Sequence, residues 1–276
     1  MTQKKTRVLF TLATIAVLAS CAGPEAPEPP GAPAASDEAA VRFETREVNA
    51  TSADCGTAGA PCARVEITLA QPVSGGTQEV RDNLEMYSRH WVVSRLREQL
   101  GDGVGDKTGA MDDLAAAFLA RHLVFTAEFQ DAAADWFIEV DAEPLYSSAR
   151  VATLDLSISS YTGGAHPNAR RRLVSFAVPS GQLLGADDLT TDTDALTAAV
   201  ERRFREQRGL GPADDIEAAG FWLSDGRFTL PDNLGVVADG LLVHWDAYEI
   251  APYSMGPTTV QVPKEDLDGI VTLDVW

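Results

Sequence analysis

The 276-residue chain has few of the residues that build common catalytic centres. It contains three cysteines and four histidines, and no Cys-x-x-Cys pair, His-Glu-x-x-His run or Gly-x-Ser-x-Gly turn occurs in it. A Gly-x-x-x-x-Gly-Lys-Ser/Thr loop is also missing, which argues against a phosphate-cradling nucleotide site. We therefore predict no catalytic residue, no metal and no cofactor, and the sequence leaves open whether the protein is an enzyme.

Cations are also scarce. The formal net charge is −19, and Lys107 and Lys264 are the only lysines after the first seven residues. Removal of an N-terminal segment that contains Lys4, Lys5 and Arg7 would take the charge to −22. Such a chain repels nucleic acid and anionic lipid head groups. An acidic surface either keeps an exported protein soluble or matches a basic partner, and the composition does not decide between them.

A long apolar run is the third absence. The run from Val8 to Leu18 has about half of the roughly 20 residues that a bilayer-spanning helix needs. It follows three cations in residues 4–7 and ends in Leu18-Ala19-Ser20-Cys21. A basic start, a short apolar stretch and small residues before a cysteine are typical of a secretion signal with a lipoprotein cleavage box.

This pattern predicts where the protein resides. Residues 1–20 are expected to be a signal peptide, and Cys21 is expected to carry lipid such as palmitate. An aspartate directly after the lipidated cysteine would retain the protein at the inner membrane. This position is Ala22, which resembles the pattern of outer-membrane lipoproteins. The expected location is thus the bacterial outer membrane, with the folded part facing the periplasm.

The two remaining cysteines lie close together in this expected oxidising compartment. Cys55 and Cys62 flank a six-residue Gly- and Ala-containing segment, which favours a local disulfide bond. A metal or redox pair is the alternative. The spacing is wider than the usual two-residue gap, and no histidine lies in the segment.

Composition and periodicity divide the rest of the chain. Residues 21–40 are rich in Pro, Ala and Glu and are expected to form a tether. Apolar periodicity then predicts helices from Thr77 to Leu100 and over 111–129. It predicts strands at 65–69, 136–140, 151–160 and 173–178, and a strand-like segment at 269–275. His122 falls on the apolar stripe of the second helix, which favours a hydrogen-bonded buried residue over a metal ligand.

Six segments in the later half of the chain form an ordered set of motifs. They are Tyr161–Pro167, Pro179–Leu189, Phe228–Leu230, Gly240–Trp245, Tyr248–Pro257 and Val260–Pro263. Their order and spacing resemble the RsiV-like extracytoplasmic family, which contains the domain of unknown function 3298. The resemblance covers about 156–267, and the strand and two helices before it are similar to the companion domain of unknown function 4163.

The resemblance implies an α+β fold of two small domains with mainly antiparallel sheets and a few packed helices. It places an N-terminal α+β domain, 4163-like, at 41–155. A C-terminal α+β domain, 3298-like and similar to the C-terminal part of RsiV, is expected at 156–276. Because RsiV-like extracellular parts bind lysozyme, the resemblance also implies a lysozyme-like ligand.

Two clusters hold the candidate ligand-binding residues. The first is the glycine-rich turn with Tyr161, Gly163, Gly164 and His166, where the histidine could contact a ligand or act as a general base. Its alternative role is to hold a hairpin turn. The second cluster contains Tyr248 and Tyr253, which either line a groove or belong to a strand that is broken by Pro252 at a sheet edge.

Three functions are compatible with these features. The favoured one is a lipid-anchored envelope protein that binds a basic periplasmic protein, such as a lysozyme-like enzyme, or peptidoglycan, without catalysis. The membrane would be contacted through the Cys21 lipid, and nucleic acid is not an expected partner. The alternatives are a cell-wall hydrolase that uses His166 with nearby acids, and a structural envelope spacer, which a broad exposed apolar patch would indicate.

Overall fold

The computed structural model describes residues 39–101, 109–130 and 134–276. The chain divides into two units, Met1–Ala34 and Ala35–Trp276, and the described residues belong to the second. The predicted signal peptide, Cys21 and all but the last two residues of the predicted tether lie outside the described residues. No described helix is both long enough and apolar enough to cross a membrane.

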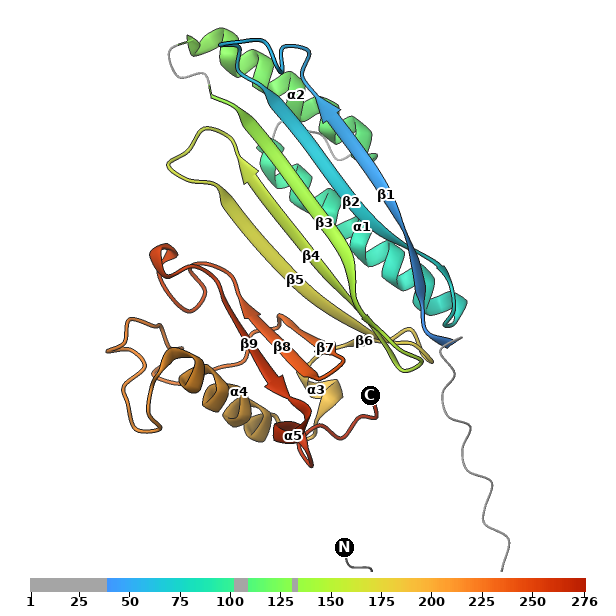
Figure 1. Ribbon diagram of the computed structural model, residues 1–276, viewed down its shortest axis with the longest axis vertical. Coiled ribbons are helices and arrows are strands. Elements are labelled where there is room, and N and C mark those ends of the chain that lie inside the picture. Colours follow the sequence, from blue (N-terminus) through green and yellow to red (C-terminus); the bar gives the residue numbers. More distant parts are fainter. Residues whose placement is uncertain (1–38, 102–108, 131–133) are drawn as a thin grey trace, which may run out of the picture. The chain divides into compact units, whose positions relative to one another are not determined.

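A six-stranded sheet is the largest element of the fold (Figure 1). Its strands lie in the order in which they occur in the chain: β1 (Arg42–Thr51), β2 (Ala63–Ser74), β3 (Trp136–Ser147), β4 (Val151–Tyr161), β5 (Asn168–Ala177) and β6 (Leu183–Leu184). All neighbouring pairs are antiparallel except β2 and β3, which are parallel. This order makes β3, β4 and β5 a meander joined by short turns.

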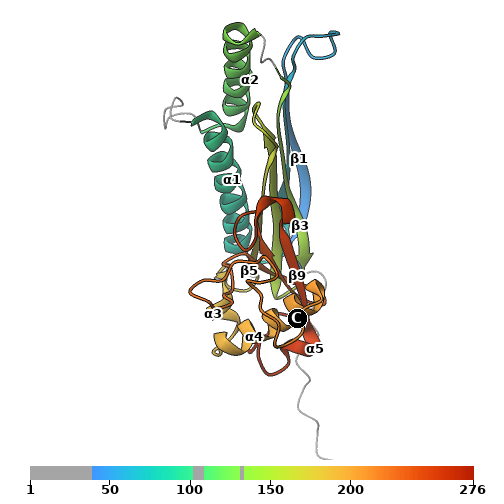
Figure 2. The same ribbon diagram turned by 90° about the vertical axis from the view of Figure 1, so that its left-hand side faces the viewer.

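Two helices connect the parallel pair and cover one face of the sheet (Figure 2). They are α1 (Gln78–Leu100) and α2 (Met111–Glu128). A parallel connection needs such a crossover because the chain must return to the same end of the sheet. Alternate residues of β3, including Ile138 and Val140, are buried against the helices, while Glu139 and Asp141 lie on the other face.

The beginning of α1 follows from its sequence. The side-chain oxygen of Thr77 accepts a hydrogen bond from the backbone N–H of Val80 at 3.1 Å, which satisfies one of the free donors at the helix start. Gly101 ends the helix at a φ of 65°, where a side chain would be strained. The predicted boundaries of this helix are confirmed.

A smaller antiparallel sheet completes the structure. It contains β7 (Leu234–Val237), β8 (Gly240–Trp245) and β9 (Thr258–Pro263), in that order. The helices of this part are α3 (Ala186–Leu189), α4 (Thr193–Arg208), the single 3₁₀ turn η4 (Tyr253–Met255) and α5 (Lys264–Leu267). Asp192 caps α4 through the N–H of Ala195 at 2.9 Å.

The two sheets are joined where β7 packs on β4 and β5. The Thr153 hydroxyl donates to the Val236 carbonyl at 2.7 Å, and the Ser175 hydroxyl accepts from the Val236 N–H at 2.9 Å. The Asn233 side chain accepts from the N–H of Leu173 at 2.8 Å and donates to the carbonyl of Arg171 at 2.7 Å. All three side chains are buried, so these bonds form away from competing water.

The expected α+β class is confirmed by this mixture of helices and mostly antiparallel sheets. The expected boundary between 155 and 156 falls inside β4. Two hydrophobic clusters exist, one around the helices and β1–β5 and one around β7–β9, and Val151 of β4 belongs to the second.

Two segments differ from the sequence-based expectations. β1 was not predicted, because its residues are mostly exposed and polar and show no apolar alternation. The segment at 269–275 is not a strand. Ile270 and Val271 both donate their backbone N–H to the carbonyl of Leu267, and Gly269 has a φ of 70°, so the chain turns there instead of extending.

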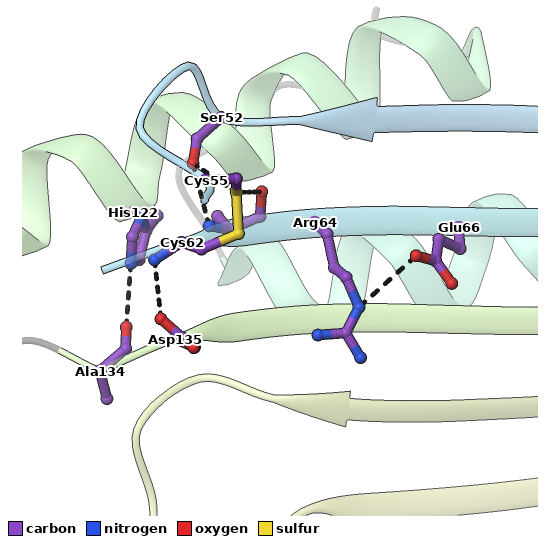
Figure 3. The surroundings of a disulfide bond; sticks show 9 residues. Ser52, Cys55, Cys62, Arg64, Glu66, His122, Ala134 and Asp135 are labelled. Carbon is purple, nitrogen blue, oxygen red and sulfur yellow. Dashed lines mark hydrogen bonds and ion pairs between the residues drawn. A yellow bond between two sulfur atoms is a disulfide. The ribbon is translucent and has the colours of Figure 1, made fainter. Parts of the chain in front are cut away.

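Cys55 and Cys62 form a disulfide bond in the β1–β2 connection, with Cα atoms 4.7 Å apart (Figure 3). The expected disulfide is thus present. The loop is fixed further by two backbone contacts: Ala63 donates to the Ser52 hydroxyl at 3.0 Å, and Cys62 donates to Asp135 Oδ1 at 2.8 Å. Closing so short a loop stabilises the fold by about 2.5 kcal/mol in the chain-entropy model.

Candidate functional site

A cleft of about 750 Å³ lies between the large sheet and the β8–β9 connection. Its floor is the sheet face that the helices do not cover, and its wall is the segment around η4. Residues of both parts line it, including Glu139, Asp141, Ser157, Ser159, Ala169 and Tyr253. The floor is polar because the apolar residues of the same strands point to the helices, as the alternation in β3 and β4 requires.

The two predicted clusters meet at this cleft. The ring of His166 stacks on that of Tyr253, with centroids 3.8 Å apart and planes 20° apart. The Tyr253 hydroxyl donates to the carbonyl of Pro167 at 3.1 Å. Tyr248 lies beside Tyr253, with ring centroids 5.7 Å apart. Segments that are more than 80 residues apart in the sequence thus form one aromatic group, which we call the aromatic shelf (His166, Tyr248 and Tyr253).

Tyr248 has a conformation that is uncommon for its residue type. Its φ is 72° and its side chain is 58% exposed. A non-glycine residue in this region is strained and persists only where its surroundings hold it. The Tyr248 N–H donates to the carbonyl of Ala251 at 3.0 Å, and Glu249 accepts from the N–H of Asp246 at 2.7 Å, so the turn is held at both ends.

A polar network ties β8 and β9 to the floor of the cleft. Asp246 Oδ1 accepts from the backbone N–H of Arg171 at 2.9 Å and lies 3.2 Å from His244 Nε2. Because a carboxylate oxygen accepts, Nε2 of the histidine donates there. Nδ1 of His244 lies 2.7 Å from the hydroxyl of Thr259 on the neighbouring strand. The buried imidazole therefore connects β8 to β9 while Asp246 connects both to β5.

Arg171 is the cation of this network. Its guanidinium forms two hydrogen bonds to Asp155, at 2.9 and 2.6 Å. The hydrogen bonds that Arg171 donates to Asp155 raise the pKa of Arg171 above its usual value, against the lowering effect of burial. This bidentate pair fixes both side chains on the floor of the cleft.

The other residues of the glycine-rich turn shape the loop and not the cleft. The Tyr161 hydroxyl donates to the carbonyl of Gly164 at 2.8 Å. Gly163 has a φ of 89°, and a Cβ there would lie 3.5 Å from Nε1 of Trp136. Of the six predicted ligand-binding residues, Tyr253 lines the cleft, and Tyr161, Gly163, Gly164, His166 and Tyr248 do not.

Sequence reasoning assigned no role to His244, Asp246 or Asp155. Each is one polar residue in or beside a strand, and no local pattern links them. Their connection arises only when β4, β5, β8 and β9 come together. The polar alternation of β4, in which Asp155, Ser157 and Ser159 share a face, was the one available signal of an uncovered sheet face.

Neither His166 nor His122 has the neighbours of a catalytic constellation among the described residues. Nδ1 of His166 lies 2.9 Å from the carbonyl of Pro167, and within the described residues no carboxylate is hydrogen-bonded to its ring. Nε2 of His122 lies 3.0 Å from the carbonyl of Ala134 in a buried position (Figure 3). In the described ranges, no group of three or more His, Cys, Asp or Glu side chains could hold a metal ion.

Comparisons with known proteins agree with the fold. Residues 187–265 match the model of a family described as "Protein of unknown function (DUF3298)". A DUF3298 family structure from Bacteroides fragilis is 19% identical, with a TM-score of 0.67, and the match covers 87% of this chain and 96% of that one. A DUF3298 family structure from Pseudomonas aeruginosa is 18% identical, with a TM-score of 0.58, and the match covers 85% of this chain and 97% of that one. Comparison with curated proteins gives no match.

The match to the DUF3298 model covers the region from α3 to the start of α5. At identities below 20% the two structures show a shared fold and no more. Both matches extend over nearly the whole of the neighbouring chains, so the large sheet and the small sheet belong to one recurring arrangement. The RsiV-like and 4163-like assignments stay predictions.

Proposed function

We propose that this protein is a lipid-anchored envelope protein of the bacterial outer membrane that binds a cell-wall ligand in the cleft beside the aromatic shelf, without catalysis. The observation that carries the proposal is the meeting of His166 and Tyr253 at the rim of a 750 Å³ cleft with a polar floor. Clefts with a few fixed polar groups and exposed aromatic rings are typical binding sites. The N-terminal signal and Cys21 supply the expected address.

Peptidoglycan is the favoured ligand. It is the polymer that surrounds a protein anchored in the periplasm. Its sugar and amide groups need both hydrogen-bond donors and hydrogen-bond acceptors as partners. The cleft offers hydroxyls from Ser157 and Ser159, carboxylates from Glu139 and Asp141, and the ring of Tyr253.

A basic protein such as a lysozyme-like enzyme is the second candidate, and the charge favours it. The formal charge is −19 before any signal is removed. The open sheet face carries Glu66, Glu139, Asp141 and Glu143 on alternate positions of β2 and β3, and Arg64 is ion-paired with the first two. Such a surface accelerates the approach of a cationic partner. Binding that depends on charge alone would weaken strongly as salt rises.

Co-sedimentation with purified peptidoglycan sacculi tests the proposal. The full-length protein should pellet with sacculi at physiological salt, and Tyr253→Ala should reduce the bound fraction at least fivefold. Phe129→Ala, which removes an exposed aromatic ring outside the cleft, serves as the matched control and should bind as the original does. Equal binding of the two variants would contradict a role of the shelf.

Lysozyme and an inert basic protein of similar charge are measured in parallel by calorimetry. Lysozyme binding that persists at physiological salt, with none for the basic control, would favour the second candidate. Incorporation of labelled palmitate that Cys21→Ser abolishes tests the anchor.

A further inference from the structure

The edge of β5 that faces away from β4 is closed over most of its length, by β6 at one end and by two side chains further along. The N–H of Leu173 donates to Asn233 and the N–H of Arg171 donates to Asp246. Both residues thus direct their backbone groups away from β4. In an antiparallel strand every second residue does so, which means that Ala169 presents its N–H and C=O to the same side.

Ala169 is where this edge meets the cleft. The residue is exposed and lines the cleft together with Tyr253. The position before it on the same side is Pro167, which has no N–H, and its carbonyl already accepts from the Tyr253 hydroxyl. The open edge is therefore one residue long, with one donor and one acceptor.

The length of this open edge distinguishes between two classes of ligand. An extended peptide that adds to a sheet edge forms hydrogen bonds along several residues, which the caps at Arg171 and Leu173 and the proline at 167 prevent. A single amide group does not need such a run, because its carbonyl can accept one hydrogen bond from the Ala169 N–H. An acetamido group on a sugar is a single amide of this kind.

The surroundings of Ala169 fit the rest of such a sugar. Tyr253 is 37% exposed, and its ring is held in place by its stack on His166 and by the hydrogen bond to Pro167. Little freedom is therefore lost when a sugar ring packs on it. On the other side of Ala169, the register places Ser159 directly opposite it on β4 and Glu139 opposite Ser159 on β3. Hydroxyl and carboxylate groups of this kind bind sugar hydroxyls.

We infer that the cleft recognises the N-acetylated glycan strand of its ligand, through the acetamido group at the Ala169 edge and the sugar ring on Tyr253, and not the peptide part. The inference rests on the proposed function, since it names the part of the cell wall that the cleft contacts.

Calorimetry of the full-length protein with N-acetylglucosamine tetramer tests it, with the de-N-acetylated tetramer and a free stem pentapeptide as comparison ligands. The acetylated tetramer should bind at least tenfold more tightly than either. Ala169→Pro removes the edge donor without removing a sheet hydrogen bond and should weaken binding at least tenfold, as should Tyr253→Ala. Phe129→Ala should leave it unchanged.

The outcomes separate this inference from the proposed function. If sacculi bind in a Tyr253-dependent manner while the acetylated tetramer does not bind, or binds no better than its de-N-acetylated form or the pentapeptide, recognition of the acetamido group is wrong and cell-wall binding stands. Full binding by a folded Ala169→Pro variant would also overturn it. If sacculi do not bind at all, the proposed function fails together with the inference.

Discussion

At the scale of single residues, Gly235 decides how closely the small sheet approaches the large one. A Cβ at this position would lie 3.1 Å from Leu173 Cβ and 3.1 Å from Thr153 Cγ2. Both neighbours are buried on strands of the large sheet, so they have little room to move. Gly235→Val should therefore lower the free energy of unfolding by about 1–3 kcal/mol, as overpacked core positions do.

Urea denaturation followed by circular dichroism measures this loss. Gly109→Ala is the control, because a Cβ there meets no atom within 4 Å and its φ is not positive. An unfolding midpoint for Gly235→Val equal to that of the control would show that β7 can move away from β5 without cost.

The residue scale also shows what the sequence could reveal of the site. His166 was singled out because it lies in a glycine-rich turn, and Tyr253 because it belongs to a polar and aromatic cluster. The structure brings the two side chains together. Asp246 and Asn233 were not singled out, because their roles are to cap backbone groups of a strand that is at least 60 residues earlier. Capping of a distant strand leaves no periodic signal in the sequence.

At the scale of elements, the ends of the long helix α1 were easier to predict than the edge strand β1 and the pairing of the strands. The cap at Thr77 and the glycine at 101 mark α1 at both ends, since these signals are local. The polar edge strand β1 and the parallel pairing of β2 with β3 depend on contacts between distant segments. Edge strands are often charged to prevent pairing with other chains, which removes the apolar alternation that identifies a strand.

The packing of α4 against α5 depends on an ion pair with a pH-dependent effect. Arg203 donates a hydrogen bond to Asp266, and Arg202 lies 3.5 Å from the same carboxylate. The hydrogen bond from Arg203 holds the pKa of Asp266 below its usual value, against the raising effect of burial. Since the folded pKa is depressed, the pair stabilises the fold above the unfolded pKa of about 3.9 and this contribution is lost as the pH falls through the folded pKa.

Arg203→Met should lower the free energy of unfolding by about 1 kcal/mol at pH 7, because both side chains are partly exposed and solvent screens the pair. The difference from the original protein should shrink as the pH falls below about 4. Urea denaturation at both pH values checks this, with Arg202→Met, whose side chain is half exposed, as the control with the smaller effect. A difference that does not change with pH would mean that packing of the arginine stem, and not the charge, is responsible.

At the scale of the whole folded unit, the two hydrophobic clusters are connected through β4. Leu154 and Leu156 belong to the cluster under the helices, while Val151 of the same strand belongs to the cluster around the small sheet. The buried bonds from Thr153 and Ser175 to Val236 join the two sheets between these clusters. An opening of the small sheet alone would break these buried hydrogen bonds, each of which contributes about 0.5–1.5 kcal/mol net to stability.

The described unit should consequently unfold as one cooperative body. Hydrogen exchange followed by mass spectrometry should give amides of β4 and of β8 the same free energy of opening, equal to that of global unfolding. Thr153→Val, which keeps the side-chain volume and removes the hydroxyl bond to β7, should make β8 amides exchange sooner than those of β4. If β8 already exchanges much faster in the original protein, the small sheet opens independently. The cleft between the sheets would then be a hinged site and not a fixed one.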